Sequence, residues 1–186
     1  METTKIYLIR HAHAEWPGDE ARPLSPAGLD AAQLVADRLA SLPITALYSS
    51  PSRRSIETVE PLANRLGLHP EMVADLRERK LPTVPPDEFD SVVLEAWRCP
   101  DQAPRGGESN VQAQTRGLAV VRSVATRHHG LEVALATHGN LLALMLNGLD
   151  SAFGYEFWRR LSFPDVYRLA LDDHKLIGVE RFWNAA

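Results

Sequence analysis

Three apolar segments of the sequence each run directly into polar residues, and this repeated arrangement constrains the fold more than any other feature. The apolar segments are residues 6–9, 46–48 and 133–136, and the polar residues that follow them are Arg10-His11, Ser49-Ser50 and Thr137-His138. Short runs of aliphatic and β-branched residues such as these indicate buried strands. In open α/β sheets, the carboxyl ends of the strands form the crevice that binds a ligand. We therefore expect the three polar segments to meet in space.

Four other segments have the periodicity of helices. Residues 25–39 begin with a Ser25 cap and Pro26 in the first turn, and one apolar face is predicted for Leu29, Ala32, Ala36 and Leu39. Residues 52–66 end before Gly67, with a kink predicted at Pro61. Residues 109–128 and 140–146 complete the set, with Val111 placed on the apolar side of the third helix.

The order of these elements predicts the fold class. Residues 166–171 and 176–180 are predicted as closing strands, and residues 89–97 as a short helix within a proline-rich stretch. Strands that alternate with helices predict an α/β fold, a three-layer α/β/α sandwich with a mostly parallel central sheet. Because 186 residues match the size of one ordinary domain, we expect a single domain over residues 1–186. Its one irregular excursion, a loop-rich cap, is expected at about residues 81–107.

Composition and charge exclude several classes of protein. No apolar run approaches the roughly 20 residues that a membrane helix needs, so no membrane contact is expected. The first ten residues lack the apolar core of a secretory signal, and the single Cys99 agrees with a reducing compartment, so a cytoplasmic location is expected. A net charge of -4 provides no overall attraction for nucleic acid. Local cations must therefore bind any anionic substrate.

The residues at the three strand ends indicate the chemistry. His11 and His138 are expected there together with Arg10 and with one arginine of the pair Arg53 and Arg54, which lies in the first turn of a helix. Guanidinium groups bind phosphate oxygens in pairs of hydrogen bonds, and a neutral imidazole nitrogen can attack phosphorus. The combination predicts a site for covalent phosphoryl transfer.

These motifs resemble, in order, those of the histidine phosphatase superfamily, which includes the phosphoglycerate mutases. The similarity covers most of the chain and is carried by residues 8–11, 24–28, 49–58, 76–78, 107–109 and 137–140. It implies a phosphoglycerate mutase-like fold in which His11 attacks the phosphoryl group and Glu78 protonates the leaving oxygen. Arg10, Arg54 and His138 would stabilise the phosphate oxygens, and water would then hydrolyse the phosphohistidine. The resemblance implies no metal and no organic cofactor.

The sequence departs from the family pattern just after His11. The family commonly has Gly-Glu-Thr there and an asparagine three residues later, whereas this chain has Ala12-His13-Ala14 and Pro17. Together with the segment that begins at Arg22, this looks more like the short phosphohistidine-phosphatase or broad-specificity phosphatase branch than like the mutases. The small cap also favours hydrolysis over mutation. The expected substrate is a small phosphorylated metabolite or a phosphorylated protein.

The sequence also allows several alternatives. The function could instead be that of a phosphoglycerate-type mutase or a non-catalytic phosphate-binding module. His11 and His13 could share a metal, although no third ligand is near in sequence, and Glu78 competes with ordinary surface carboxylates at Glu71, Asp75 and Glu108. The aromatic residues between 153 and 163 could line a substrate pocket or pack the core, and core packing is favoured; Phe182 and Trp183 either tuck down the terminus or form a homodimer contact.

Overall fold

The strands and helices follow the order expected from the sequence. The structure, a computed structural model, describes residues 2–15, 22–82, 84–85, 87–104 and 106–183. Its strands are β1 (Thr4–Arg10), β2 (Ile44–Ser49), β3 (Glu71–Met72), β4 (Glu132–Thr137), β5 (Asp165–Asp172) and β6 (Lys175–Arg181). Its helices are α1 (Pro26–Leu39), α2 (Arg53–Leu66), the 3-10 turn η1 (Ala74–Leu76), α3 (Phe89–Arg98), α4 (Asn110–Arg127), α5 (Gly139–Leu149) and α6 (Tyr155–Arg159).

The sheet brings the three strand ends together. In the described part of the chain it has six strands in the order β3-β2-β4-β1-β5-β6. The first four are parallel, whereas β5 and β6 run antiparallel to their neighbours. Since β2, β4 and β1 are adjacent and parallel, their carboxyl ends lie at one edge, with Arg10 beside Thr137 and Ser49 beside Ala136. The expected meeting of the three polar segments is confirmed.

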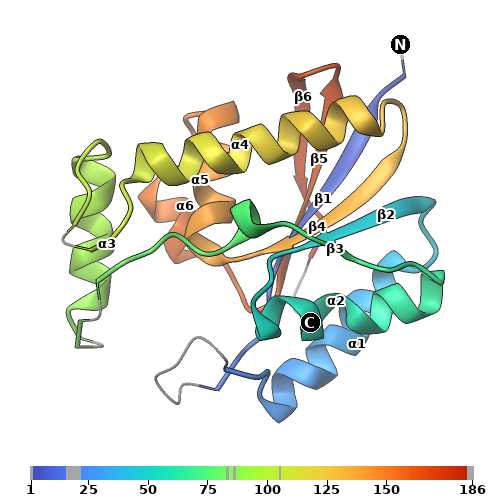
Figure 1. Ribbon diagram of the computed structural model, residues 1–186, viewed down its shortest axis with the longest axis horizontal. Coiled ribbons are helices and arrows are strands. Elements are labelled where there is room, and N and C mark those ends of the chain that lie inside the picture. Colours follow the sequence, from blue (N-terminus) through green and yellow to red (C-terminus); the bar gives the residue numbers. More distant parts are fainter. Residues whose placement is uncertain (1, 16–21, 83, 86, 105, 184–186) are drawn as a thin grey trace.

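Alternation along β1 divides the core between the two faces of the sheet. Tyr7 and Ile9 belong to the apolar cluster under α1 and α2, while Ile6 and Leu8 belong to the cluster under α4, α5 and α6. Figure 1 shows these helices on opposite sides of the sheet. The predicted three-layer α/β/α architecture with a mostly parallel sheet is therefore confirmed.

Local signals account for the bounds of the helices. The Ser25 hydroxyl accepts a hydrogen bond from the Gly28 amide at the start of α1, and Gly67 ends α2 in the left-handed conformation with φ 64°. Helix α2 continues through Pro61. Helix α4 begins with a complete capping box between Ser109 and Gln112.

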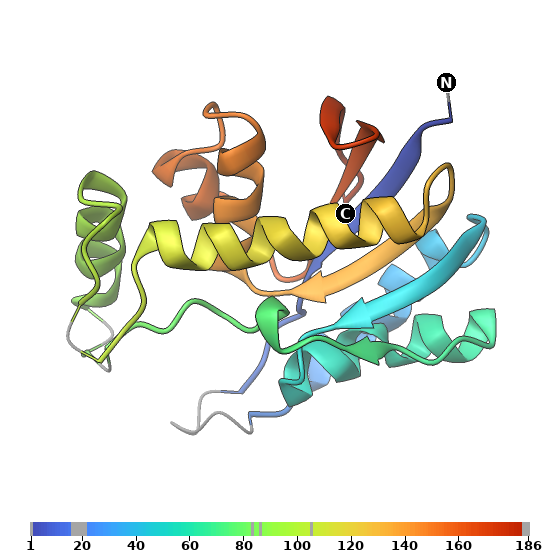
Figure 2. The ribbon, with the colours of Figure 1, turned by 45° about the horizontal axis from the view of Figure 1, so that its top comes forward.

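Two side chains assigned to buried helix faces are instead exposed. Leu29 is 49% exposed on α1 and Val111 is 40% exposed on α4. In α1 the buried face passes through Gly28 and Val35, so it is rotated relative to the predicted one. Val111 lies in the first turn of α4, which extends past the sheet toward α3 (Figures 1 and 2).

Candidate active site

His11 follows β1 and is oriented by the backbone around it. Its own amide donates to the Thr137 carbonyl at 3.0 Å, and its Nδ1 lies 2.7 Å from the Ala12 carbonyl. Because a carbonyl oxygen only accepts, Nδ1 carries the hydrogen and Nε2 carries the lone pair. Arg54 Nε donates to that Nε2 at 3.2 Å. The nitrogen available for attack thus faces a cation.

The electrostatic environment keeps His11 neutral. Its side chain is 5% exposed. Burial lowers the pKa of His11 to about 3, and the positive charges of Arg54, Arg10 and Arg22 contribute in the same direction. At neutral pH the imidazole is therefore unprotonated, which is the form that a nucleophile needs.

His138 follows β4 and is completely buried beside His11. The two ring centroids are 5.1 Å apart. Arg54 Nη2 donates to His138 Nδ1 at 3.0 Å, so the hydrogen lies on Nε2, which donates to Ser50 Oγ at 2.8 Å. Burial, followed by the proximity of His11 and the charge of Arg54, holds the pKa of His138 well below its usual value.

Arg54 bonds to both histidines because its side chain points from α2 toward them. It is 6% exposed, whereas the side chain of its neighbour Arg53 is 59% exposed and pairs with Glu57 at 2.6 Å. Thr58 ties the same helix to the nucleophile segment, since its hydroxyl accepts from the Ala12 amide at 3.0 Å and donates to the Arg54 carbonyl at 2.6 Å. The structure places Arg54 in the site and Arg53 at the surface.

Arg10 precedes His11 at the end of β1 and is held by residues of the segment before β5. Its Nη1 donates to the Leu161 carbonyl at 2.8 Å, and its Cζ lies 3.3 Å from the centroid of the Phe163 ring. Burial lowers the pKa of Arg10 to about 10, against the opposing effects of the Glu78 and Asp165 charges. Arg10 therefore remains positively charged at neutral pH.

Glu78 lies at the N-terminus of α5, the helix that begins directly after His138. Its two carboxylate oxygens accept hydrogen bonds from the amides of Asn140 at 3.1 Å and Leu141 at 3.0 Å, and one of them also accepts from Arg79 N at 2.8 Å. Glu78 is therefore not an ordinary surface carboxylate. The competing carboxylates are each paired with an arginine instead: Glu71 with Arg127, Asp75 with Arg77 and Glu108 with Arg116.

Two residues near the histidines were not assigned to the site from the sequence. Arg22 is half-buried, and its charge contributes to the lowered pKa of both His11 and His138. In the sequence, Arg22 was noted only as the first residue of the segment that distinguishes the phosphatase branch of the family from the mutases. Phe163 was predicted to pack in the core, and this was wrong: it is 46% exposed, with its centroid 5.5 Å from that of His11.

The residues after His11 that differ from the family pattern have different surroundings. Ala12 is buried against Leu24 and Ala32, so a small side chain fits the packing there. His13 is exposed, and its Nδ1 lies 2.8 Å from Ser25 Oγ, the hydroxyl that caps α1. Pro17, which stands where the family has asparagine, lies outside the described residues.

Among the described residues there is neither a candidate metal site nor a helix suited to span a membrane. Within residues 2–15, 22–82 and the later described ranges, no group of three or more His, Cys, Asp or Glu side chains is arranged to hold a metal ion. In the same part of the chain, no helix combines the length and the apolar character that crossing a bilayer requires.

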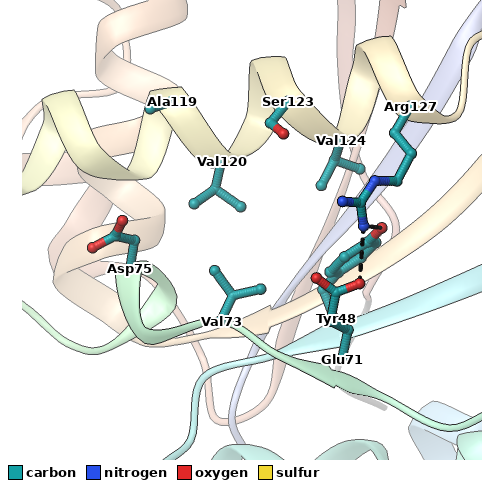
Figure 3. A pocket seen from close by; sticks show the side chains of 9 residues that line it. All are labelled: Tyr48, Glu71, Val73, Asp75, Ala119, Val120, Ser123, Val124 and Arg127. Carbon is teal, nitrogen blue, oxygen red and sulfur yellow. Dashed lines mark hydrogen bonds and ion pairs between the residues drawn. The ribbon is translucent and has the colours of Figure 1, made fainter.

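A separate hollow of about 270 Å³ lies between α4 and the β2–β3 side of the sheet (Figure 3). Three of its polar side chains are bonded to one another: Arg127 donates to Tyr48 Oη at 3.3 Å and to Glu71 at 2.9 Å. Val73 and Val120 form part of the apolar lining. Neither histidine lines this hollow, and neither Arg54 nor Glu78 does, so the hollow is separate from the candidate active site.

Comparison with known proteins relates this arrangement to one family. The sequence model of the histidine phosphatase superfamily (branch 1) matches residues 6–176. A curated relative, the probable phosphoglycerate mutase GpmB of Proteus mirabilis, is 30% identical over 159 residues, which cover 77% of this chain and 73% of that protein.

Solved structures give the same fold. A mycobacterial glucosyl-3-phosphoglycerate phosphatase superposes with a TM-score of 0.80 at 24% identity and covers 99% of this chain and 100% of its own. A variant of phosphoserine phosphatase from Entamoeba histolytica, in complex with phosphoserine, superposes with a TM-score of 0.76 at 18% identity and covers 95% and 96% of the two chains. At these identities the likeness establishes the phosphoglycerate mutase-like fold.

Proposed function

This chain belongs to the histidine phosphatase superfamily, and we propose that it is a metal-independent phosphatase that hydrolyses a phosphomonoester or a phosphohistidine through a covalent phosphohistidine at His11. The observation that carries the proposal is the state of His11, a buried neutral imidazole whose Nε2 lone pair faces the Arg54 guanidinium. A phosphate drawn to that guanidinium comes within reach of the nucleophile. The substrate is a small phosphorylated metabolite or a phosphorylated protein.

Phosphate binding replaces contacts that the free site makes within itself. Arg54 donates to the neutral nitrogens of both histidines, and charged phosphate oxygens are stronger acceptors. Burial is the main cause of the low pKa of His138, and the negative charge of a bound phosphate acts against it and against the nearby arginine charges. His138 takes up a proton on Nδ1 from the incoming phosphate group, and this second N–H donates to a phosphate oxygen, alongside Arg10 and Arg54.

The first step forms a bond between His11 Nε2 and phosphorus and breaks the bond between phosphorus and the leaving oxygen. A protonated Glu78 gives its proton to that oxygen, and the emerging carboxylate is received by the amides at the start of α5. The charge on the three equatorial oxygens is stabilised by the arginines.

The second step reverses the role of Glu78. Its carboxylate accepts a proton from a water molecule as the water oxygen bonds to phosphorus and the bond to His11 Nε2 breaks. Inorganic phosphate leaves, and His11 and Glu78 return to their starting states. All groups in this cycle belong to the chain, the substrate and water, so it needs no metal or organic cofactor.

A phosphoglycerate-type mutase is the second candidate, and the 30% identity to a probable phosphoglycerate mutase favours it. A mutase returns the phosphoryl group to a substrate hydroxyl and needs a bisphosphate primer, whereas a phosphatase releases inorganic phosphate without one. The modest cap over residues 81–107, with α3 as its helix, favours hydrolysis because it offers little structure to exclude water. Phosphate release in the absence of any primer separates the two activities.

The test is release of inorganic phosphate from p-nitrophenyl phosphate in the presence of a chelator. We expect activity in the wild type, none in His11→Ala, and near wild-type activity in His13→Ala, whose imidazole is exposed and bonded to Ser25. Loss of wild-type activity on chelation would contradict metal independence. Absence of activity in every protein would favour the phosphate-binding module or a narrow substrate range.

A further inference from the structure

The Arg10 guanidinium lies between an aromatic ring and a glycine. Its Cζ is 3.3 Å from the centroid of Phe163, and a Cβ added to Gly139 would lie 2.9 Å from the same atom. The atoms nearest that Cβ all belong to Arg10 and none to Phe163, so the ring and the glycine cover opposite faces of the guanidinium. Both faces of Arg10 are therefore occupied.

The edges of the guanidinium differ from one another. Nη1 donates to the carbonyls of Leu161 at 2.8 Å and Ser162 at 3.4 Å. Nε is buried and has no hydrogen-bond partner in the part of the chain that the structure describes. The edge that Nε forms with Nη2 is one of the edges that bind an oxyanion with two parallel hydrogen bonds. We infer that the Nε–Nη2 edge of Arg10 binds a ligand.

The turn that carries Phe163 is fixed by an ion pair between the buried Asp165 and the more exposed Arg181. Asp165 is fully buried, accepts from Arg181 at 3.0 and 2.9 Å, and also accepts from the Ser162 amide at 3.0 Å. Asp165 is moreover the register partner of Arg10 across the β1–β5 pair. The sheet thus sets the position of the ring relative to Arg10. Burial does not explain the ring itself, because 46% of Phe163 is exposed.

We propose that Phe163 is a positioning residue, which stacks on the Arg10 guanidinium and so directs its Nε–Nη2 edge toward the phosphoryl group of the substrate. The role of Arg10 as a phosphate ligand comes from the function proposed above, on which this inference rests. Stacking of a cation on an aromatic face supplies attraction that an aliphatic side chain of similar size does not. The flat ring also excludes rotations of the guanidinium out of its plane.

The test measures the affinity for orthovanadate, a phosphate analogue, by isothermal titration calorimetry. We expect Phe163→Leu to weaken binding about ten-fold, which corresponds to about 1.4 kcal/mol, while Phe163→Tyr keeps near wild-type affinity because the ring is retained. Phe182→Leu is the matched control, since Phe182 stacks on Arg168 at 6.0 Å outside the site. Phe163→Met provides a second aliphatic variant if the leucine protein is unstable.

A double-mutant cycle separates positioning from a general structural effect. In an Arg10→Gln background, Phe163→Leu should cause no further loss of vanadate affinity, because there is no guanidinium to position. The same ten-fold loss in that background, or unchanged affinity in Phe163→Leu and Phe163→Met alone, would overturn the inference. So would a wild type that binds no vanadate. A wild type that binds vanadate in a Phe163-dependent manner but releases no phosphate would refute the phosphatase proposal alone.

Discussion

At the scale of single residues, the candidate site depends on which nitrogen of each histidine carries a hydrogen. The Ala12 carbonyl fixes His11 with its lone pair on Nε2, and Arg54 fixes His138 with its lone pair on Nδ1. One guanidinium therefore orients both imidazoles in the free protein. The Glu78 carboxylate is held by backbone amides, those of Asn140 and Leu141 at the start of α5 and that of Arg79.

The assignment of Glu78 as general acid predicts a dependence on the leaving group. Glu78→Gln should lower kcat/KM for an alkyl phosphate by about 10²–10⁴-fold, the range of general acid catalysis. The loss for p-nitrophenyl phosphate should be far smaller, because p-nitrophenolate departs without being protonated. Steady-state kinetics on the two substrates measures the difference.

A structural effect of the Glu78 substitution can be distinguished from a catalytic one. Weakening the start of α5 would lower the rates on both substrates by the same factor, and that result would contradict the assignment. Asp75→Asn is the matched control, since Asp75 is an exposed carboxylate bonded to Arg77, and it should leave both rates unchanged.

At the scale of helices and strands, periodicity and capping residues predicted the longer elements because each carries its own signal. The shortest elements were missed: β3 has two residues, η1 three and α6 five, too few for a pattern to develop. The site was predicted where it follows directly from strand ends, as for His11 and His138. Phe163 and Arg22 come from connecting segments, and their positions depend on packing that no local pattern encodes.

Two neighbouring arginines in the first turn of α2 allow a matched test of which side chain binds phosphate. Arg53 and Arg54 are neighbours in sequence, but Arg54 points to the histidines and Arg53 to solvent. We expect inorganic phosphate to raise the Tm of the wild type and of Arg53→Gln by similar amounts, since a ligand that binds only the folded state stabilises it. Arg54→Gln should lose most of that increase in a thermal melt. The reverse order of effects would place the phosphate ligand at the other arginine.

At the scale of the whole molecule, a chain with a net charge of -4 gathers Arg10, Arg22 and Arg54 around two buried neutral histidines. The carboxyl edge of the parallel strands and the first turn of α2 make this local concentration of positive charge possible. The attraction for an anion is therefore confined to one edge of the sheet. We expect the free energy of unfolding to depend on pH for the same reason, because both histidines resist protonation in the folded state.

The resulting prediction concerns the free energy of unfolding between pH 7 and pH 4.5. The pKa of His11 is about 3 in the folded protein and about 6.5 in an unfolded chain, so the unfolded state binds the extra proton as the pH falls below 6.5. Stability that is complete above pH 6.5 is lost on acidification, by up to about 1.4 kcal/mol per pH unit for this histidine. Urea unfolding of His11→Asn should show a shallower decline than the wild type. Equal slopes would contradict the buried neutral state.

The proposed mechanism requires a covalent phosphohistidine at His11. The most direct measurement mixes the wild type with p-nitrophenyl phosphate, quenches the reaction in alkali, in which phosphohistidine survives, and locates the modification by peptide mass spectrometry. We predict one added phosphoryl group on His11 in the wild type and none at any position in His11→Ala. Release of phosphate by a wild type that never carries the group on His11, or that carries it on another residue, would contradict the proposal.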